Sequence, residues 1–137
     1  IAGAAVLHAE GDPLAAVTAF TGGDGFDVVF DATGNRAAME KGFEFVAHGG
    51  RYVLVSVIKE TITFMDPDFH RREMTLLGSR NATNDDFRRV IAAIRAGQVP
   101  IDRLVTHRTS LAAAADNIPV WATQKSGLIK ALVEIGD

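Results

Sequence analysis

Short apolar runs alternate with helical patterns along most of this chain, and this alternation is the strongest constraint on its fold. The runs at residues 28–30 and 53–55 are continuously apolar, without the polar residue at every second position that a half-exposed strand carries. Continuous runs are typical of strands that are buried on both faces, as in a parallel sheet covered by helices on each side. The sequence therefore predicts an α/β fold with three layers and a parallel sheet in the middle.

The same pattern places the individual elements. Strands are predicted at residues 4–9, 26–31, 51–57, 74–78, 104–109 and 128–135, with a further short strand at 61–64. A helix begins at Asp12-Pro13, a second covers residues 36–47 and is closed by His48-Gly49-Gly50, and residues 66–72 form a helical turn. Asn84 is predicted to cap a helix over residues 85–96, and Ser110 to cap an alanine-rich helix that Pro119 breaks or kinks.

Composition excludes several classes of protein. The 137 residues carry a net charge of −3 and no block of Lys and Arg, so a nucleic-acid interface is not expected. No apolar run approaches the roughly 20 residues that span a bilayer, and no leader segment is recognised at the start. Cysteine is absent, which excludes disulfides and thiolate metal ligands from these residues. A cytoplasmic location is expected.

Five segments resemble one known family. They are FDVVFDATG (26–34), HGGRYVLVSV (48–57), REMTLLGSRNAT (72–83), LVTHRTSL (104–111) and GLIKALVEI (127–135). In this order and at this spacing they resemble the later half of the nucleotide-binding domain of zinc-type alcohol dehydrogenases, in the medium-chain dehydrogenase/reductase superfamily. GSRNAT resembles a signature of the polyol and sugar-acid dehydrogenase branch.

The resemblance implies a Rossmann-like parallel sheet that lacks its first βαβ unit. Residues 1–137 would then be a partial dinucleotide-binding domain, together with the C-terminal strand-helix-strand of a longer enzyme. The GxGxxG turn, the acidic ribose-binding residue and the family's Cys and His-Glu zinc ligands are not found here. The implied cofactors are NAD or NADP, with zinc in the missing N-terminal domain, and the implied substrate is an alcohol or polyol. The chain alone is expected to be inactive.

The resemblance also implies partners for exposed strand edges. In the common strand order 3-2-1-4-5-6, the chain would begin near the third strand, which leaves an edge of the strand at residues 26–31 uncovered. We expect this edge to be covered by a second copy, by a rearranged first segment or by an absent piece of a longer chain. We also expect a homo-oligomer, a dimer or tetramer. The strand at 74–78 resembles one that pairs with its mate across a two-fold axis in this superfamily.

Candidate cofactor-binding residues follow from the strand ends, because ligands of open α/β sheets bind at the carboxyl ends of the strands. The resemblance places the adenosine side of the cofactor at Ala32, Thr33 and Gly34. It places the nicotinamide at Val55, Ser56 and Val57. Main-chain contacts to the nicotinamide carboxamide are implied at Thr75, Leu77, Gly78 and Ser79. Arg80 is expected to bind a phosphate or carboxylate, and Lys130 to neutralise the pyrophosphate. The alternatives are a surface arginine, an outward-facing lysine and a simple turn at Gly34.

No residue of this chain is nominated as catalytic or as a metal ligand. The four histidines lack metal-ligand spacing, and His107 is interpreted as a structural histidine. Asp66, Asp68 and Glu73 are expected to face solvent, and Asp85 and Asp86 to be charges in the first turn of a helix. The alternative to an oxidoreductase is a free-standing α/β binding or oligomerisation module without a cofactor, one variant being a methyltransferase-like domain. The module would be favoured if the crevice at Thr33, Ser56 and Arg80 were closed.

Overall fold

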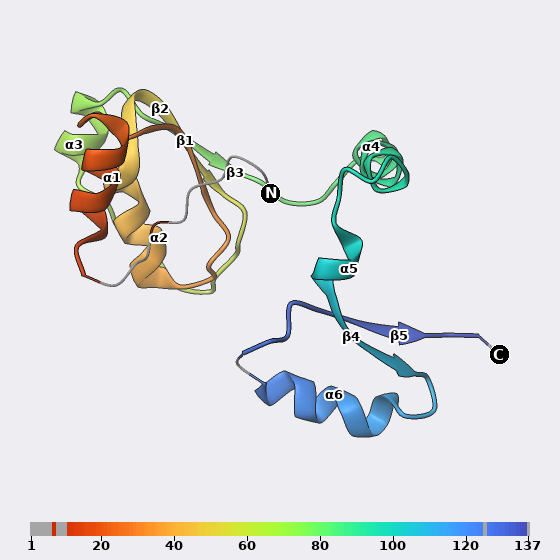
Figure 1. Cartoon of the computed structure of the whole chain (residues 1–137). Helices are drawn as coiled ribbons and strands as arrows, with labels where there is room; N and C mark the ends of the chain where they lie inside the picture. Colours follow the sequence, from red (N-terminus) through yellow and green to blue (C-terminus); the bar gives the residue numbers. More distant parts are fainter. Residues whose placement is uncertain (1–6, 8–10, 125, 137) are drawn as a thin grey trace. The chain divides into compact units, whose positions relative to one another are not determined.

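A computed structural model describes residue 7 and residues 11–124 and 126–136. The chain divides into two compact units, Ile1–Asn81 and Ala82–Asp137, and each is considered by itself (Figure 1). The strand predicted at residues 4–9 lies outside the described residues, apart from Leu7. Within the described part of the chain, no helix has the length and apolar character needed to cross a membrane.

The first unit alternates helices and strands. Its elements are α1 (Pro13–Thr21), β1 (Phe26–Asp31), α2 (Arg36–Gly42), the 3-10 turn η1 (Phe43–Phe45), β2 (Val46–Leu54), α3 (Asp66–Arg71) and β3 (Thr75–Gly78). Asp12 caps α1 by accepting from two backbone N–H groups, with Pro13 in the first turn. Asn35 caps α2 by accepting from the Ala38 N–H.

The three strands form a parallel sheet in the order β1-β2-β3. Val29 pairs with Tyr52 and Asp31 with Leu54 on the neighbouring strand. The predicted α/β class and parallel pairing are confirmed. This order is that of strands 4, 5 and 6 in the common arrangement, and among the described strands β1 and β3 are the edges.

The core of the first unit lies on one face of this sheet. Phe43, Val46, Tyr52 and Met74 are buried there, and α2, η1 and the loop after β2 supply the side chains that cover it. On the opposite face the exposed fraction of Phe30 is 67%. The burial of both faces that the apolar runs predict is therefore not reached within the described residues, because the helices of this unit pack against a single face.

Several predicted elements in this unit differ from the structure. The helix predicted at residues 36–47 ends at Gly42, tightens into η1 and turns into β2 at Val46, so His48-Gly49-Gly50 lies inside a strand. Gly25 and Phe45 explain the turn, since a Cβ on Gly25 would lie 2.6 Å from the Phe45 carbonyl oxygen and only glycine permits this approach. The strand predicted at 51–57 ends at Leu54, and no strand forms at 61–64.

The second unit contains α4 (Asn84–Arg95), α5 (Ile101–Leu104), β4 (Val105–Ser110), α6 (Ala114–Thr123) and β5 (Lys130–Glu134), with β4 and β5 parallel. Thr83, rather than the predicted Asn84, caps α4 through a reciprocal pair of hydrogen bonds with Asp86. Ala113, rather than Ser110, precedes α6, and this helix continues through Pro119. Pro119 removes one N–H donor from the helix, and this loss does not break it here.

Candidate functional site

The carboxyl ends of β1 and β2 bring two of the predicted groups together. Because the strands are parallel neighbours, residues 32–34 and residues 55–57 leave the sheet at the same edge. The backbone N–H groups of Val55 and Ser56 both donate to the carbonyl oxygen of Asp31, at 2.8 and 3.2 Å. The loop after β2 is thereby fixed against the end of β1.

The side chain of Asp31 connects the same two loops. It is buried, with an exposed fraction of 5%, although it ends a strand beside the solvent-accessible edge of the sheet. Its Oδ1 accepts from the Ser56 hydroxyl at 2.6 Å and from the Thr33 N–H at 3.2 Å, and its Oδ2 accepts from the Thr33 hydroxyl at 2.9 Å. The Gly34 N–H donates to Ser56 Oγ at 3.0 Å. Thr33 and Ser56 therefore both bind Asp31, and Gly34 binds Ser56 on the other loop, so that these four residues form one hydrogen-bonded cluster.

Tyr52 lies behind this cluster on the covered face of β2. Its hydroxyl donates to the Met39 carbonyl oxygen at 2.8 Å, which joins the strand to α2. Gly42 has no side chain because the Tyr52 ring occupies the position that a Cβ would take. Burial raises the pKa of Tyr52 to about 12, and the negative charge of Asp31 contributes to this increase. The tyrosine therefore stays neutral at physiological pH.

A hollow of about 460 Å³ opens beside these loops, at the carboxyl ends of β2 and β3. Of the predicted site residues, Ser56, Val57, Gly78, Ser79 and Arg80 line it. Within the described part of the chain, no ion pair involves Arg80. The remaining lining residues were not predicted from the sequence: Met39, Leu54, Ile58, Glu60 and Ile62.

Other predicted residues lie elsewhere. Thr75 and Leu77 pair with Arg51 and Val53 within the sheet and do not line the hollow. Lys130 is the first residue of β5 in the second unit, where it is exposed and its carbonyl oxygen accepts from the Thr106 hydroxyl at 3.3 Å. The structure thus joins the first two predicted groups and part of the third.

Asp31 is the residue of this cluster that the sequence did not single out. The sequence predicts a strand at residues 26–31 and assigns no role to the carboxylate that ends it. A detectable signal was present, because a carboxylate at the end of a buried strand, followed by Thr and Gly, needs hydrogen-bond donors nearby. Its partner Ser56 is 25 residues distant in sequence, so the pairing itself depends on the strand register.

His107 and the carboxylates of Asp66, Asp68 and Glu73 behave as predicted. His107 is half-buried, its Nδ1 lies 2.9 Å from the Thr106 hydroxyl, and its ring meets Trp121 edge to face. The side chains of Asp66, Asp68 and Glu73 are all more than half exposed. Among the residues that the structure describes, no group of three or more His, Cys, Asp or Glu side chains forms a metal site.

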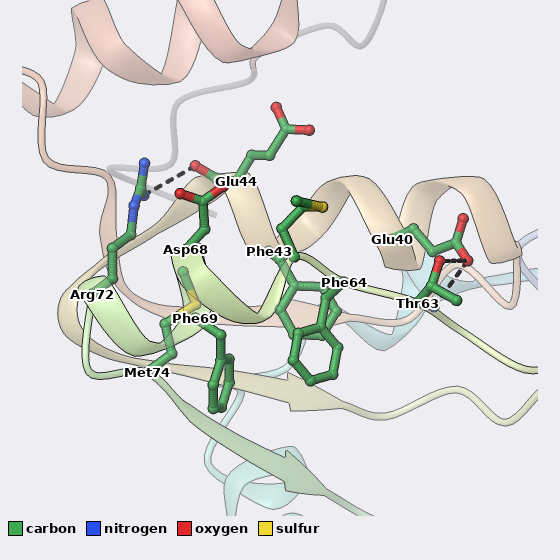
Figure 2. A pocket seen from close by; sticks show the side chains of 10 residues that line it. Glu40, Phe43, Glu44, Thr63, Phe64, Asp68, Phe69, Arg72 and Met74 are labelled. Carbon is green, nitrogen blue, oxygen red and sulfur yellow. Dashed lines mark hydrogen bonds between the residues drawn. The ribbon is translucent and has the colours of Figure 1, made fainter.

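A second hollow, of about 340 Å³, lies near the amino ends of β2 and β3. Figure 2 shows its aromatic lining, in which Phe43 and Phe64 stack with ring centroids 4.8 Å apart and Phe69 lies beside them. At its rim Arg72 donates to the Glu44 carbonyl oxygen, and Glu40 accepts from Thr63 (Figure 2). Arg72 also donates to the Val46 carbonyl oxygen. This hollow is continuous with the core and contains none of the predicted site residues.

Known proteins resemble this chain over most of its length. Residues 2–96 match the sequence model of the family described as zinc-binding dehydrogenase. L-galactonate-5-dehydrogenase of Escherichia coli (strain K12) is 38% identical over 112 residues, which cover 82% of this chain and 33% of that protein. The chain therefore spans about a third of the length of this relative.

Two solved structures extend the comparison. Alcohol dehydrogenase TADH from Thermus sp. ATN1 has a TM-score of 0.86 at 24% identity, covering 98% of this chain and 39% of the other, and shows that the fold is shared. A candidate zinc-binding dehydrogenase from Sinorhizobium meliloti 1021, bound to NADP, has a TM-score of 0.74 at 28% identity, covering 82% and 32%.

Proposed function

The chain belongs to the zinc-binding dehydrogenase family, and from this premise we propose that it forms part of the nucleotide-binding domain of an NAD(P)-dependent alcohol or polyol dehydrogenase. The observation that carries this function is the junction of residues 32–34 with residues 55–57 beside an open hollow. This junction stands at the carboxyl edge of a parallel sheet, where α/β proteins bind nucleotides.

The residues at this edge fit a nucleotide. Gly34 has φ +61°, and no atom lies within 4 Å of the position that a Cβ would take at Gly34 or Gly78, so a ligand can approach the main chain at both. Ser56 and Thr33 offer hydroxyl oxygens that suit ribose hydroxyls. Arg80, at the hollow, suits a phosphate or carboxylate oxygen. An open hollow also disfavours the alternative of a cofactor-free module.

In this proposal each predicted group has a role. Residues 32–34 contact the adenosine side, and residues 55–57 and the main chain of residues 75–79 contact the nicotinamide side. The role of Lys130 in neutralising the pyrophosphate is kept as a separate prediction for the second unit. The bound dinucleotide would exchange a hydride with the alcohol carbon of the substrate. The protein's own contribution is to orient the ring and ribose through the loops that Asp31 holds.

We propose no zinc ligand among the described residues of this chain. No described side-chain cluster fits zinc, so we propose that the ion is bound by another part of a longer enzyme, where it would act as a Lewis acid on the substrate oxygen. The 137 residues alone are then inactive. The similarity to L-galactonate-5-dehydrogenase supports a polyol or sugar acid as the substrate class.

The edge of the sheet at β3 is available for self-association. β3 is an edge strand of the described sheet, and its backbone groups can pair with those of a second copy in a dimer or tetramer. We propose a homo-oligomer on this ground, and a cytoplasmic location.

The first test is nucleotide binding by the purified protein. NADH and NADPH are titrated while their fluorescence is recorded, and saturable binding of one or both is expected. Ser56→Trp, which fills the hollow, is expected to abolish binding, whereas Ser126→Trp in the second unit is not. Turnover of a polyol panel by the 137-residue chain with zinc and NAD would contradict the predicted inactivity, and absence of nucleotide binding would contradict the proposed site.

A further inference from the structure

Asp31 is an unusual carboxylate because it is buried without a cation. Among the described residues, no Lys, Arg or His lies within ion-pair distance of it. A buried charge of this kind requires hydrogen-bond donors in place of a counter-ion. Its side chain has three: the Thr33 N–H and the hydroxyls of Thr33 and Ser56.

The direction of these hydrogen bonds follows from the donor inventory. An ionised carboxylate only accepts, so each hydroxyl gives its single proton to Asp31. Both hydroxyl oxygens also accept from the backbone, Ser56 Oγ from Gly34 N–H at 3.0 Å and Thr33 Oγ1 from Asn35 N–H at 3.2 Å. Each hydroxyl is left with one lone pair and no proton, so both can only accept from a ligand.

The corner formed by Thr33, Gly34 and Ser56 is therefore negative and rich in acceptors. The Gly34 N–H, which would otherwise be available to an anion, is already bonded to Ser56. Arg80 brings a cation to this edge, at the hollow beyond β3. A ligand across this edge would direct hydroxyl or amide donors toward Asp31 and anionic oxygens toward Arg80.

We propose that Asp31 is a positioning residue that fixes both loops and makes the hydroxyls of Thr33 and Ser56 obligate acceptors, so that this corner selects the hydroxyl-bearing ribose of a nucleotide over its phosphates. This role rests on the proposed function and assigns the chemistry of one corner of the site. Asp31 acts through its two partners, without touching the nucleotide itself.

The test compares Asp31→Asn with Asp27→Asn, a matched change at an exposed carboxylate on the same strand. The asparagine amide can donate, which releases one hydroxyl proton and removes the charge. Loss of charge-assisted bonds predicts that the Kd for NADH rises about tenfold or more, whereas the Kd for inorganic pyrophosphate stays the same or falls. Asp27→Asn is expected to change neither. If Asp31→Asn raised the Kd for NADH and the Kd for pyrophosphate equally, the role of Asp31 would be merely structural, and the proposed selection of ribose over phosphate would be overturned.

A second readout needs no nucleotide. Asp31→Asn is expected to accelerate amide hydrogen exchange at Thr33, Gly34, Val55 and Ser56, and Asp27→Asn is not. Unchanged exchange at these amides overturns the role of Asp31 even if NADH binds normally. If the unaltered protein binds neither NADH nor NADPH, the proposed function and the ribose selection both fail, while exchange still decides whether Asp31 fixes the loops.

Ser56→Ala tests the same role if Asp31→Asn does not fold. This change removes one acceptor and the partner of the Gly34 N–H, while the backbone bonds to Asp31 persist. Exchange at Gly34 should accelerate, and NADH should bind about threefold to tenfold more weakly, with pyrophosphate unchanged. Unaltered NADH affinity in Ser56→Ala would contradict the acceptor role.

Discussion

The two ends of the sheet in the first unit differ in chemistry, although they belong to the same strands. At the carboxyl end a buried carboxylate orders two hydroxyls and a glycine beside an open hollow that contains an arginine. At the amino end Phe43, Phe64 and Phe69 pack against one another over the core (Figure 2). Apolar contacts of this kind lower the free energy of folding, whereas polar groups with spare hydrogen-bonding capacity serve ligands.

Within this one small unit, stability therefore depends on the amino end of the sheet and ligand binding on the carboxyl end. Changes at the amino end should alter the free energy of unfolding and leave nucleotide affinity unchanged. Substitutions of exposed residues at the carboxyl end should alter nucleotide affinity and leave the free energy of unfolding unchanged.

The largest effect is expected at Phe43, whose exposed fraction is 7%. Phe43→Ala removes a ring that contacts Tyr52, Phe64 and Phe69, and should lower the free energy of unfolding by about 3–5 kcal/mol. Chemical denaturation measures this change. Phe87→Ala, at an exposed phenylalanine of α4, is the matched control and should have little effect. A stable Phe43→Ala variant with weakened NADH binding would contradict the division.

A smaller effect is expected at Tyr52, the only tyrosine of the chain. Tyr52→Phe leaves the buried Met39 carbonyl oxygen without its donor and should cost about 1–3 kcal/mol. Because the pKa of Tyr52 is raised to about 12, the folded state holds this proton more tightly than the unfolded state, whose value is near 10. Its contribution to stability is complete below about pH 10 and is lost as the pH rises toward 12.

The single tyrosine makes this titration directly observable. Tyrosinate absorbance should appear near pH 12 in the folded protein, and the alkaline loss of stability should be smaller in Tyr52→Phe. Ionisation near pH 10 without unfolding would show that the hydroxyl is neither buried nor bonded to Met39.

At the carboxyl end, Arg80→Ala should weaken NADH binding about tenfold, since one charged hydrogen-bond donor is lost. The free energy of unfolding should change by less than about 0.5 kcal/mol, because the side chain is exposed. Arg89→Ala, on exposed α4, serves as the control. If Arg80→Ala and Arg89→Ala bound NADH with the same Kd, the placement of Arg80 in the binding site would be contradicted.

The smallest effect is expected at Glu40, which lies at the rim of the aromatic hollow. Its Oε1 accepts from Arg36 and from the N–H and hydroxyl of Thr63, and these bonds lower its pKa. Glu40→Gln should accelerate amide exchange at Thr63 with little change in global stability, since exposed ion pairs contribute little. Glu44→Gln, whose carboxylate pairs with Lys41, is the control. If exchange at Thr63 is the same in both variants, the loop is fixed by other contacts.

Much of the fold was predictable because local chemistry determines it. The strand at residues 26–31 has its predicted bounds, and Asp12-Pro13 begins α1 as predicted. The predicted helix at 36–47 failed because the turn at Phe43 depends on the packing of Gly25 and Gly42 against distant residues, which no local pattern records. The apolar runs predict that both faces of the sheet are covered, but Val28 and Phe30 are exposed among the described residues because the helices of the first unit cover a single face.

The candidate site was predictable in part for the same reason. Strand ends place Gly34 and Ser56 at one edge, and a parallel sheet then brings them together. Asp31 was missed because its importance lies in a hydrogen bond to Ser56 that depends on the register of two strands. Lys130 lies in β5 of the second unit, and its role at the pyrophosphate stays a prediction.

The most direct test is amide hydrogen exchange of the purified protein, mapped with and without saturating NADH. Binding at the carboxyl end predicts slower exchange at residues 32–34, 55–57 and 78–80, and unchanged exchange around Phe64 and Phe69 at the amino end. Protection confined to the aromatic hollow, or no protection at saturating nucleotide, would contradict the assignment of binding to the carboxyl end of the sheet.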